Sequence, residues 1–297
     1  MSRQAFSLYG QRERHAQSDG LEGFIAEGGF AYQDDSHDSN TVARFLAVLL
    51  NFDAGPHPVS FVQELAASMK NVLEHCFCVP WPDVHRESKR LLEGFAPAVV
   101  NVVVRLPARS RLEPDALRTV NSTLAALVGS GGHRPGVVVG ICANPHEWVE
   151  LTQLRHFVAA DLPYLERDTC ALFKTVASMM APVAIVEWDE EDLAQGLGDA
   201  HTPARLAHAV WEQEAEQLRF LSTEDGLRAS EAPSVFVSAF LPDASINTTK
   251  KLMDAYRKQA GQGRACFSVT SGFFRQVHWL AHDSSHVVTI CRQAANP

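Results

Sequence analysis

Two stretches of the sequence decide the expected fold: APAVVNVVVRLPARS at residues 96–110 and APSVFVSAFLPDAS at residues 232–245. Each begins with Ala-Pro, continues as an apolar run and reaches a Leu-Pro turn, followed by a helical pattern and a second apolar run. The turn at Leu106-Pro107 returns 135 residues later as Leu241-Pro242. A near-continuous run of Val is typical of a strand that is covered on both faces. Each stretch therefore predicts a β-α-β unit.

The two units, at about residues 96–143 and 232–273, predict α/β or α+β layering. Because they look like one unit used twice, we expect a pseudo-twofold arrangement, either a duplicated ferredoxin-like core or an α+β barrel core, with extra helices. The alternative is chance similarity between two ordinary β-α-β units, since Leu-Pro is a common dipeptide.

The segment before the first unit is expected to be helical. Apolar residues at helical spacing predict a helix over residues 41–50 and a second one over about 59–75. We therefore expect residues 1–95 to form an N-terminal helical segment that packs on a duplicated core at 96–297. A single domain overall is the alternative.

Between and after the two units, the pattern predicts further elements. Residues 145–180 are expected to be helical with a break near Pro163, and 183–187 to form a short strand. Thr202 followed by Pro203 is a good helix start, which predicts a long helix ending near Ser222. Two strand-like runs, at 276–281 and 286–291, end the chain.

Composition excludes several classes of protein. The chain has 297 residues and a formal net charge of −9, with 26 basic and 35 acidic residues and no basic patch, so nucleic acid is not an expected partner. The apolar runs are too short for a membrane span, and the polar N-terminus lacks the apolar core of a signal peptide. We therefore expect a cytoplasmic location with reduced cysteines.

The densest group of ionisable residues is His278, His282 and His286. Histidine carries metal and proton chemistry near neutral pH. If residues 283–285 form a three-residue turn, His282 lies opposite His286 on one face of a hairpin. The sequence then predicts a metal site at these three histidines, or an acid–base site; incidental histidines on a surface hairpin are the alternative.

A further catalytic candidate is His146, in the segment Asn144–Trp148 directly after an expected strand. Ligand sites in open α/β sheets favour such positions, although His146 also suits a helix start. The histidine candidates for catalysis are thus His282, His286 and His146.

The remaining signals are weak. Cys76-x-Cys78 has one residue too few between its cysteines for a usual zinc site. The glycine-rich stretch 129–136 does not match a phosphate-binding or dinucleotide pattern. The acidic run 187–192 suits a helix N-terminus better than a magnesium site.

These observations predict a cytosolic enzyme that transforms a small-molecule substrate in a pocket between the two halves. It would use a His-ligated metal or haem centre, with iron or haem the expected cofactor, or His acid–base catalysis. The alternative is a non-catalytic binding protein: an effector, an immunity or partner-binding protein, or a small-molecule sensor. No nucleic acid or membrane partner is expected, and a homodimer is the expected assembly if the chain self-associates.

Overall fold

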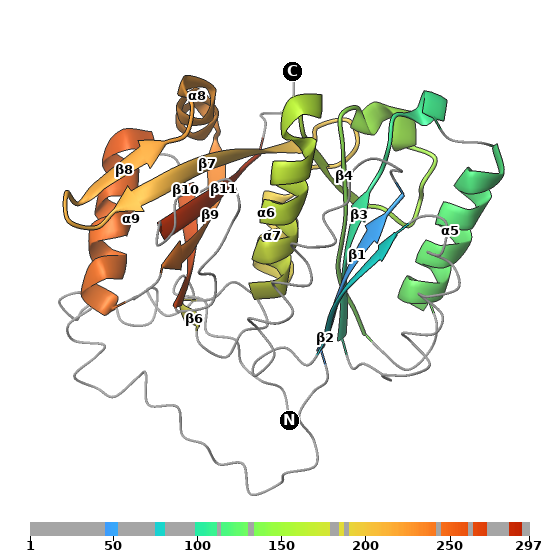
Figure 1. Ribbon diagram of the computed structural model, residues 1–297, viewed down its shortest axis with the longest axis horizontal. Coiled ribbons are helices and arrows are strands. Elements are labelled where there is room, and N and C mark those ends of the chain that lie inside the picture. Colours follow the sequence, from blue (N-terminus) through green and yellow to red (C-terminus); the bar gives the residue numbers. More distant parts are fainter. Residues whose placement is uncertain are drawn as a thin grey trace, which may run out of the picture.

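The computed structural model describes residues 45–52, 75–80, 99–111, 114–129, 134–178, 184–186, 190–241, 245–260, 264–271 and 285–292. Its strands form one mixed sheet with the order β2-β1-β3-β4-β5-β7-β11-β9-β10-β6, and β8 pairs with the end of β7 (Figure 1). The strands are β1 (Phe45–Asn51), β2 (His75–Pro80), β3 (Val99–Arg105), β4 (Arg134–Cys142), β5 (His156–Ala159), β6 (Ala184–Val186), β7 (Ala204–Glu212), β8 (Gln217–Phe220), β9 (Ser234–Leu241), β10 (Arg264–Ser271) and β11 (Ser285–Arg292).

The five first strands run parallel to one another, and β5 pairs in parallel with the start of β7. Beyond β7 the sheet becomes mixed, because β11 runs antiparallel to both of its neighbours, β7 and β9. Strands β9 and β10 are again parallel, while β6 and β8 are antiparallel to their partners. The molecule is therefore a mixed α/β structure around a central sheet of parallel and antiparallel strands.

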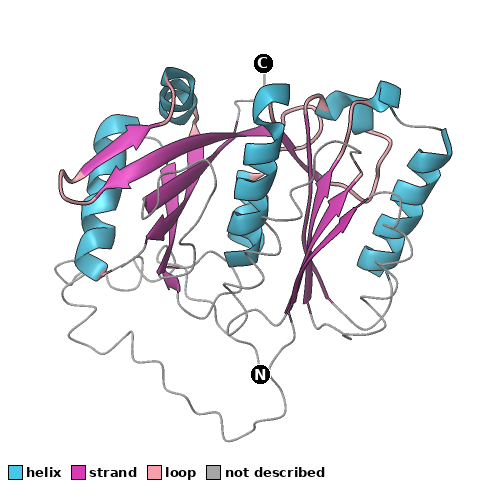
Figure 2. Ribbon diagram, viewed as in Figure 1, coloured by secondary structure: helices cyan, strands magenta, loops and turns pink. Residues whose placement is uncertain are grey.

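Helices cover both faces of this sheet (Figure 2). They are α5 (Pro114–Gly129), α6 (Leu165–Ser178), α7 (Glu190–Gly196), α8 (Thr223–Glu231) and α9 (Ile246–Ala260), with short 3-10 turns η1 (Arg109–Arg111), η2 (Pro145–Trp148) and η3 (Leu162–Tyr164). Helix α5 buries Val120 and Leu124 in the core on one face of β1, β3 and β4. Helix α6 lies on the other face of the same strands and is buried over nearly its whole length.

Helix α6 also joins the two parts of the sheet. Its apolar residues share one core with β1, β3 and β4 and with Leu206 of β7, Phe240 of β9 and Ile290 of β11. In Figure 1 it stands between the parallel strands and the mixed strands. The continuous apolar core over α6 therefore holds both halves of the sheet together.

Both predicted β-α-β units are present. Strands β3 and β4 are parallel neighbours joined through α5, and β9 and β10 are parallel neighbours joined through α9. The predicted ferredoxin-like or barrel arrangement is wrong, because β5, β7 and β11 separate the two units within one open sheet. The units do not pair with each other.

Two predicted helices, one expected from periodicity and one from a helix-start signal, are strands in the described residues. Residues 45–51 form β1, whose described side chains from Ala47 to Asn51 are fully buried, so the stretch FLAVLLN belongs in the middle of a sheet rather than on a half-exposed helix. Thr202 does not start a helix: the carboxylate of Asp199 accepts hydrogen bonds from the backbone of His201 and Thr202 and from the Thr202 hydroxyl. This turn leads into β7 and β8, where the long helix to Ser222 was predicted.

Strand β5 was also missed, inside a stretch predicted to be helical. The helix predicted at about 59–75 and the strand predicted at 276–281 lie outside the described residues, apart from His75 in β2. The predicted division between an N-terminal segment at 1–95 and a core at 96–297 stays a prediction. Within residues 1–95, the structure describes β1 with Phe52, and β2. No helix in the described ranges is long and apolar enough to cross a membrane.

Candidate functional site

In the parallel part of the sheet, the order in which the strands are added reverses direction between β1 and β3. The chain passes from β1 outward to β2, returns to β3 on the other side of β1, and then continues to β4 and β5. Connections that leave β1 and β3 therefore diverge at the carboxyl ends of these strands. In open α/β sheets, a crevice opens at such a switch point, and ligands bind there.

The two strands at this switch point end in polar residues. Asn51 of β1 and Arg105 of β3 are directly paired across the ladder, and their residues are 0% and 5% exposed. Both lie on the α6 face, because they continue the two-residue alternation of Leu49 and Val103. Burying a guanidinium is costly unless it is paired and hydrogen-bonded, so Arg105 is an unusual residue to end a buried run of valines.

Two helix N-termini also meet this edge. Helix α5 starts shortly after β3 and helix α6 starts shortly after β5, so both begin at the carboxyl ends of the parallel strands and cover opposite faces (Figure 1). The backbone N–H groups and the dipole of a helix N-terminus favour negative charge. Together with Arg105, they make the positive end of this part of the fold.

The turns after β3 and β4 are tied to each other. Glu147 accepts hydrogen bonds from the backbone N–H of Arg109, at 2.9 Å, and from the side chain of Asn144, at 3.0 Å. The Arg109 guanidinium pairs with Glu150 at 2.9 Å and lies over the ring of Trp148. These contacts fix η1 against η2, so the two turns form one wall beside the switch point.

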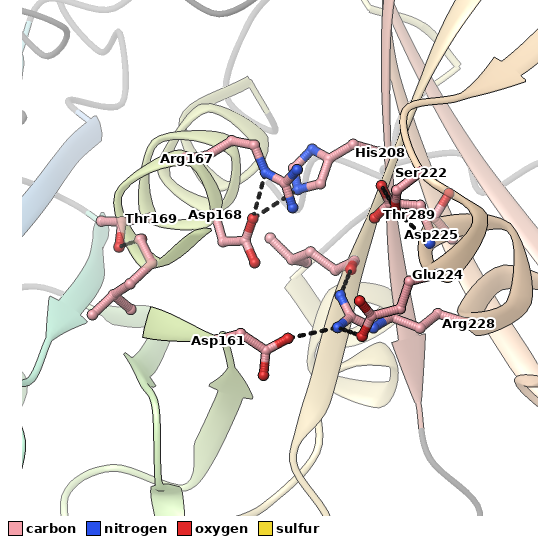
Figure 3. A network of polar contacts seen from close by, with 12 residues as sticks. Asp161, Arg167, Asp168, Thr169, His208, Ser222, Glu224, Asp225, Arg228 and Thr289 are labelled. Carbon is pink, nitrogen blue, oxygen red and sulfur yellow. Dashed lines mark hydrogen bonds and ion pairs between the residues drawn. The ribbon is translucent and has the colours of Figure 1, made fainter. Parts of the chain in front are cut away.

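A second polar group lies in the core between α6 and the mixed strands (Figure 3). His208 Nε2 is 2.9 Å from Asp168 Oδ1, and His208 Nδ1 is 3.2 Å from His286 Nε2. The two imidazole rings are stacked, and Arg167 donates a further hydrogen bond to Asp168 at 2.9 Å. All three members of the Asp168–His208–His286 chain are buried, so it joins α6, β7 and β11 out of contact with solvent.

Lys174 is a further ionisable side chain of this core. Its ammonium lies 3.9 Å from the centre of the Phe240 ring, and burial lowers the pKa of Lys174 well below its usual value. Burial also lowers the pKa of His286 well below 6.5, with smaller contributions from the charges of Lys174, His208 and Arg167. Burial therefore favours the neutral forms of Lys174 and His286 in this cluster.

A third polar group connects β5 to α8 through Asp161, as Figure 3 shows. One carboxylate oxygen of Asp161 is 2.7 Å from Nη2 of Arg228, and the other is 3.4 Å from Nη1 of Arg205. Arg228 also pairs with Glu224 and donates to the carbonyl oxygen of Leu206 at 3.2 Å. The guanidinium of Arg228 is thereby fixed in one orientation, and its pKa is raised because the attraction of the two carboxylates exceeds the opposing effect of its burial.

Of the four predicted histidines, the structure describes His146 and His286, which lie on different elements. His278 and His282 lie outside the described residues, and His286 is on β11, whose two edges pair with β7 and β9. His146 is exposed on η2, with its ring 5.7 Å from that of His201. Roles in catalysis for His282, His286 and His146 stay predictions.

Sequence reasoning missed the polar residues that the structure brings together. Arg105 was predicted to lie in a strand, but its burial was not predicted. A basic residue at the end of an otherwise apolar run could have indicated it. His208 was hidden because residues 202–222 were taken for a helix. Asp168 and Lys174 carry no sequence signal, since both suit an exposed helix face equally well.

Comparison with known proteins gives distant matches to solved structures only. No known protein family and no curated protein matches the sequence. A W319Y mutant of FtsZ from M. jannaschii is 8% identical, with a TM-score of 0.49 over 84% of this chain and 91% of that chain. An empty FtsZ dimer from M. jannaschii is 8% identical, with a TM-score of 0.48 over 93% of each chain. CetZ2 from Haloferax volcanii, a GTPγS-bound protofilament, is 11% identical, with a TM-score of 0.45 over 84% of this chain and 92% of that chain.

These findings correct the predicted function. The matching chains are FtsZ and CetZ2, and not enzymes with a metal or haem centre, so the predicted small-molecule-transforming enzyme and its small-molecule substrate are wrong. The alternative of an effector, an immunity or partner-binding protein or a small-molecule sensor stays a prediction. Within the described residues, no group of three or more His, Cys, Asp or Glu side chains is placed to hold a metal ion, so the predicted metal-binding character is wrong there. The homodimer stays a prediction.

Proposed function

We propose that this protein binds a nucleotide through its phosphates at the switch point between β1 and β3. The observation that carries the proposal is the buried pair Asn51 and Arg105, which ends the two strands side by side at that point. A guanidinium offers several N–H donors in a planar fork that suits phosphate oxygens, and the Asn51 amide can donate or accept beside it. The position in the sheet is the one that open α/β folds use for ligands.

The electrostatics of the edge support an anionic ligand. Helices α5 and α6, 16 and 14 residues long, both begin there, so their dipoles favour negative charge at this edge, although α6 also carries Glu166 and Asp168 in its first turn. The carboxylate of Glu147, which would repel phosphate, accepts hydrogen bonds from Arg109 and Asn144 in the neighbouring wall. Arg105 ends β3 on this edge, directly beside Asn51 of β1.

The phosphate site would work without a glycine-rich loop, because the charge of Arg105 takes the place of a run of backbone N–H groups. The proposal also places the protein in the cytoplasm. Cys142, Cys170, Cys266 and Cys291 are free thiols, and reduced cysteines are usual in that compartment.

Calorimetric titration of the full chain tests the proposal. GTP, ATP, the corresponding diphosphates and the free nucleosides serve as ligands. We expect saturable binding of the phosphorylated compounds and none of the nucleosides at the same concentrations. Equal binding of nucleosides and nucleotides, or no binding of any nucleotide at millimolar concentration, would contradict the proposal.

Substitution of Arg105 locates the site. Arg105→Met keeps the length of the side chain and removes its charge, and we expect it to weaken nucleotide binding by about 30-fold or more, the equivalent of about 2 kcal/mol. Arg105→Lys keeps the charge and should retain part of the affinity. Arg219→Met is the matched control, because Arg219 pairs with Glu212 at the surface of β8. Thermal unfolding of each variant without ligand separates lost affinity from lost folding.

A further inference from the structure

A positively charged hollow lies at the end of β11, separated from β3 in the sheet by β4, β5 and β7. Its volume is about 220 Å³. Arg205 at the start of β7, Arg228 on α8 and Arg292 at the end of β11 line it, with Glu231 as the acidic residue of its lining. Ala232, Pro233 and Cys291 complete the wall with small or apolar side chains. Three arginines from three elements therefore line one hollow.

The arginines are oriented by groups that do not line the hollow. Arg228 is fixed by the carbonyl oxygen of Leu206 and by Asp161 and Glu224, the two carboxylates that Figure 3 shows beside its guanidinium. The second oxygen of Asp161 lies 3.4 Å from Arg205. Because the carboxylate of Asp161 bridges both arginines, their guanidinium groups are held ready on one side of the hollow.

Arg292 differs from the other two arginines. Its contact is with the backbone carbonyl oxygen of Gln195, at 3.1 Å, and no carboxylate of the described residues lies within salt-bridge distance of it. The carbonyl uses one of the five N–H donors of the guanidinium. The lining holds three arginines and Glu231, while the carboxylates of Asp161 and Glu224, which pair with Arg205 and Arg228, lie outside it.

We infer that this hollow is a binding site for an oxyanion, the phosphate or carboxylate group of a small ligand. Arginine forks bind such groups with two parallel hydrogen bonds, and guanidinium is more weakly hydrated than ammonium, so it gives up water readily on binding. Arg228 and Arg205, both held by Asp161, supply preorganised donors, and Arg292 supplies a donor without a carboxylate partner among the described residues. Glu231 opposes the anion and limits its affinity.

The site is independent of the proposed nucleotide site, because none of its lining residues lies at the ends of β1 and β3. Calorimetric titration of the full chain with inorganic phosphate and with citrate, at constant ionic strength set by chloride, measures binding. Saturable binding of phosphate alone, of citrate alone or of both supports the site and identifies the group it prefers. Absence of saturable binding of either anion would overturn it.

Variants assign the binding to the hollow. Arg292→Gln and Arg205→Gln are expected to weaken anion binding at least tenfold, while Glu231→Gln strengthens it several-fold, a gain that a merely structural residue would not produce. Arg219→Gln is the control and should bind as the wild type does. Unchanged affinity in Arg292→Gln overturns the assignment. Arg105→Met keeps anion binding at the hollow, so failure of one site is distinguishable from failure of the other.

Discussion

His208 Nε2 lies 2.9 Å from Asp168 Oδ1, with both side chains removed from solvent between α6 and β7. The contact joins the central helix to the mixed part of the sheet, and Arg167 shares the same carboxylate oxygen. A hydrogen bond is strong in this buried, low-dielectric environment. Removing one partner leaves the other buried without a hydrogen bond, which lowers the stability of the folded state.

Asp168→Ala should therefore destabilise the protein strongly. It leaves His208 and Arg167 without the carboxylate between them, and we expect the free energy of unfolding to fall by about 3 kcal/mol. Urea denaturation at pH 7 measures the change. Asp254→Ala, at the exposed Asp254–Arg257 pair on α9, is the matched control and should change stability by less than about 0.5 kcal/mol. Similar effects of the two substitutions would show that the buried contact adds nothing special.

His286 should make the protein less stable as the pH falls below 6.5. Burial lowers its pKa in the folded state, so the unfolded chain binds a proton that the folded chain does not. Stability is then fully present above pH 6.5 and is lost toward the lower folded-state pKa, with a slope of up to about 1.4 kcal/mol per pH unit.

Denaturation between pH 6.5 and 5.5 tests this linkage. His286→Gln should flatten the slope, whereas His201→Gln, at an exposed histidine, should leave it as in the wild type. A wild-type slope that survives His286→Gln would assign the pH dependence to other groups.

Lys174→Met should stabilise the protein at neutral pH. The pKa of Lys174 is well below 10.5 in the folded state. At any pH between the folded and unfolded pKa values, the unfolded chain therefore binds a proton that the folded chain does not, which favours unfolding. Met is similar in length and has no charge to bury, and we expect a gain of about 1–3 kcal/mol at pH 7. The gain should shrink as the pH approaches 10. A loss of stability at pH 7 would instead show that the Lys174 ammonium, over Phe240, holds the core together.

Two glycines should respond to alanine with opposite signs. A Cβ on Gly198 would lie 1.8 Å from the carbonyl oxygen of Thr202, in the turn that leads into β7. Gly198→Ala should therefore destabilise the protein by more than about 2 kcal/mol. Gly226 lies inside α8 with at least 3.5 Å of space around such an atom, so Gly226→Ala should stabilise by about 0.5–1 kcal/mol. Thermal unfolding of the two variants compares them directly.

Local sequence patterns predicted the two β-α-β units but not their arrangement. The apolar run VVNVVVRL predicts a buried strand, and the helical spacing before Gly129 predicts a helix. Both signals are read from residues close together in the sequence. The place of each unit in the sheet depends on the long-range pairing of β11 with β7 and β9, which no local pattern encodes.

The errors have physical causes as well. The stretch FLAVLLN is apolar at every position but its last, so helical spacing and full burial in a strand cannot be told apart from it. Thr202-Pro203 resembles a helix start, but Asp199 holds it in a turn. The candidate site was missed for a related reason: Asn51 and Arg105 are 54 residues apart in the chain and meet only because β1 and β3 pair in register.

Hydrogen exchange of the backbone amides, followed by mass spectrometry with and without GTP, shows whether a nucleotide binds at the ends of β1 and β3. Bound phosphate at the switch point should slow exchange in peptides that cover the ends of β1 and β3 and the start of α6, with little change in α9 and β10. Protection confined to those regions, and absent in Arg105→Met, is the result that the account predicts. Unchanged exchange at Asn51 and Arg105 under saturating GTP, or protection only elsewhere in the chain, would contradict it.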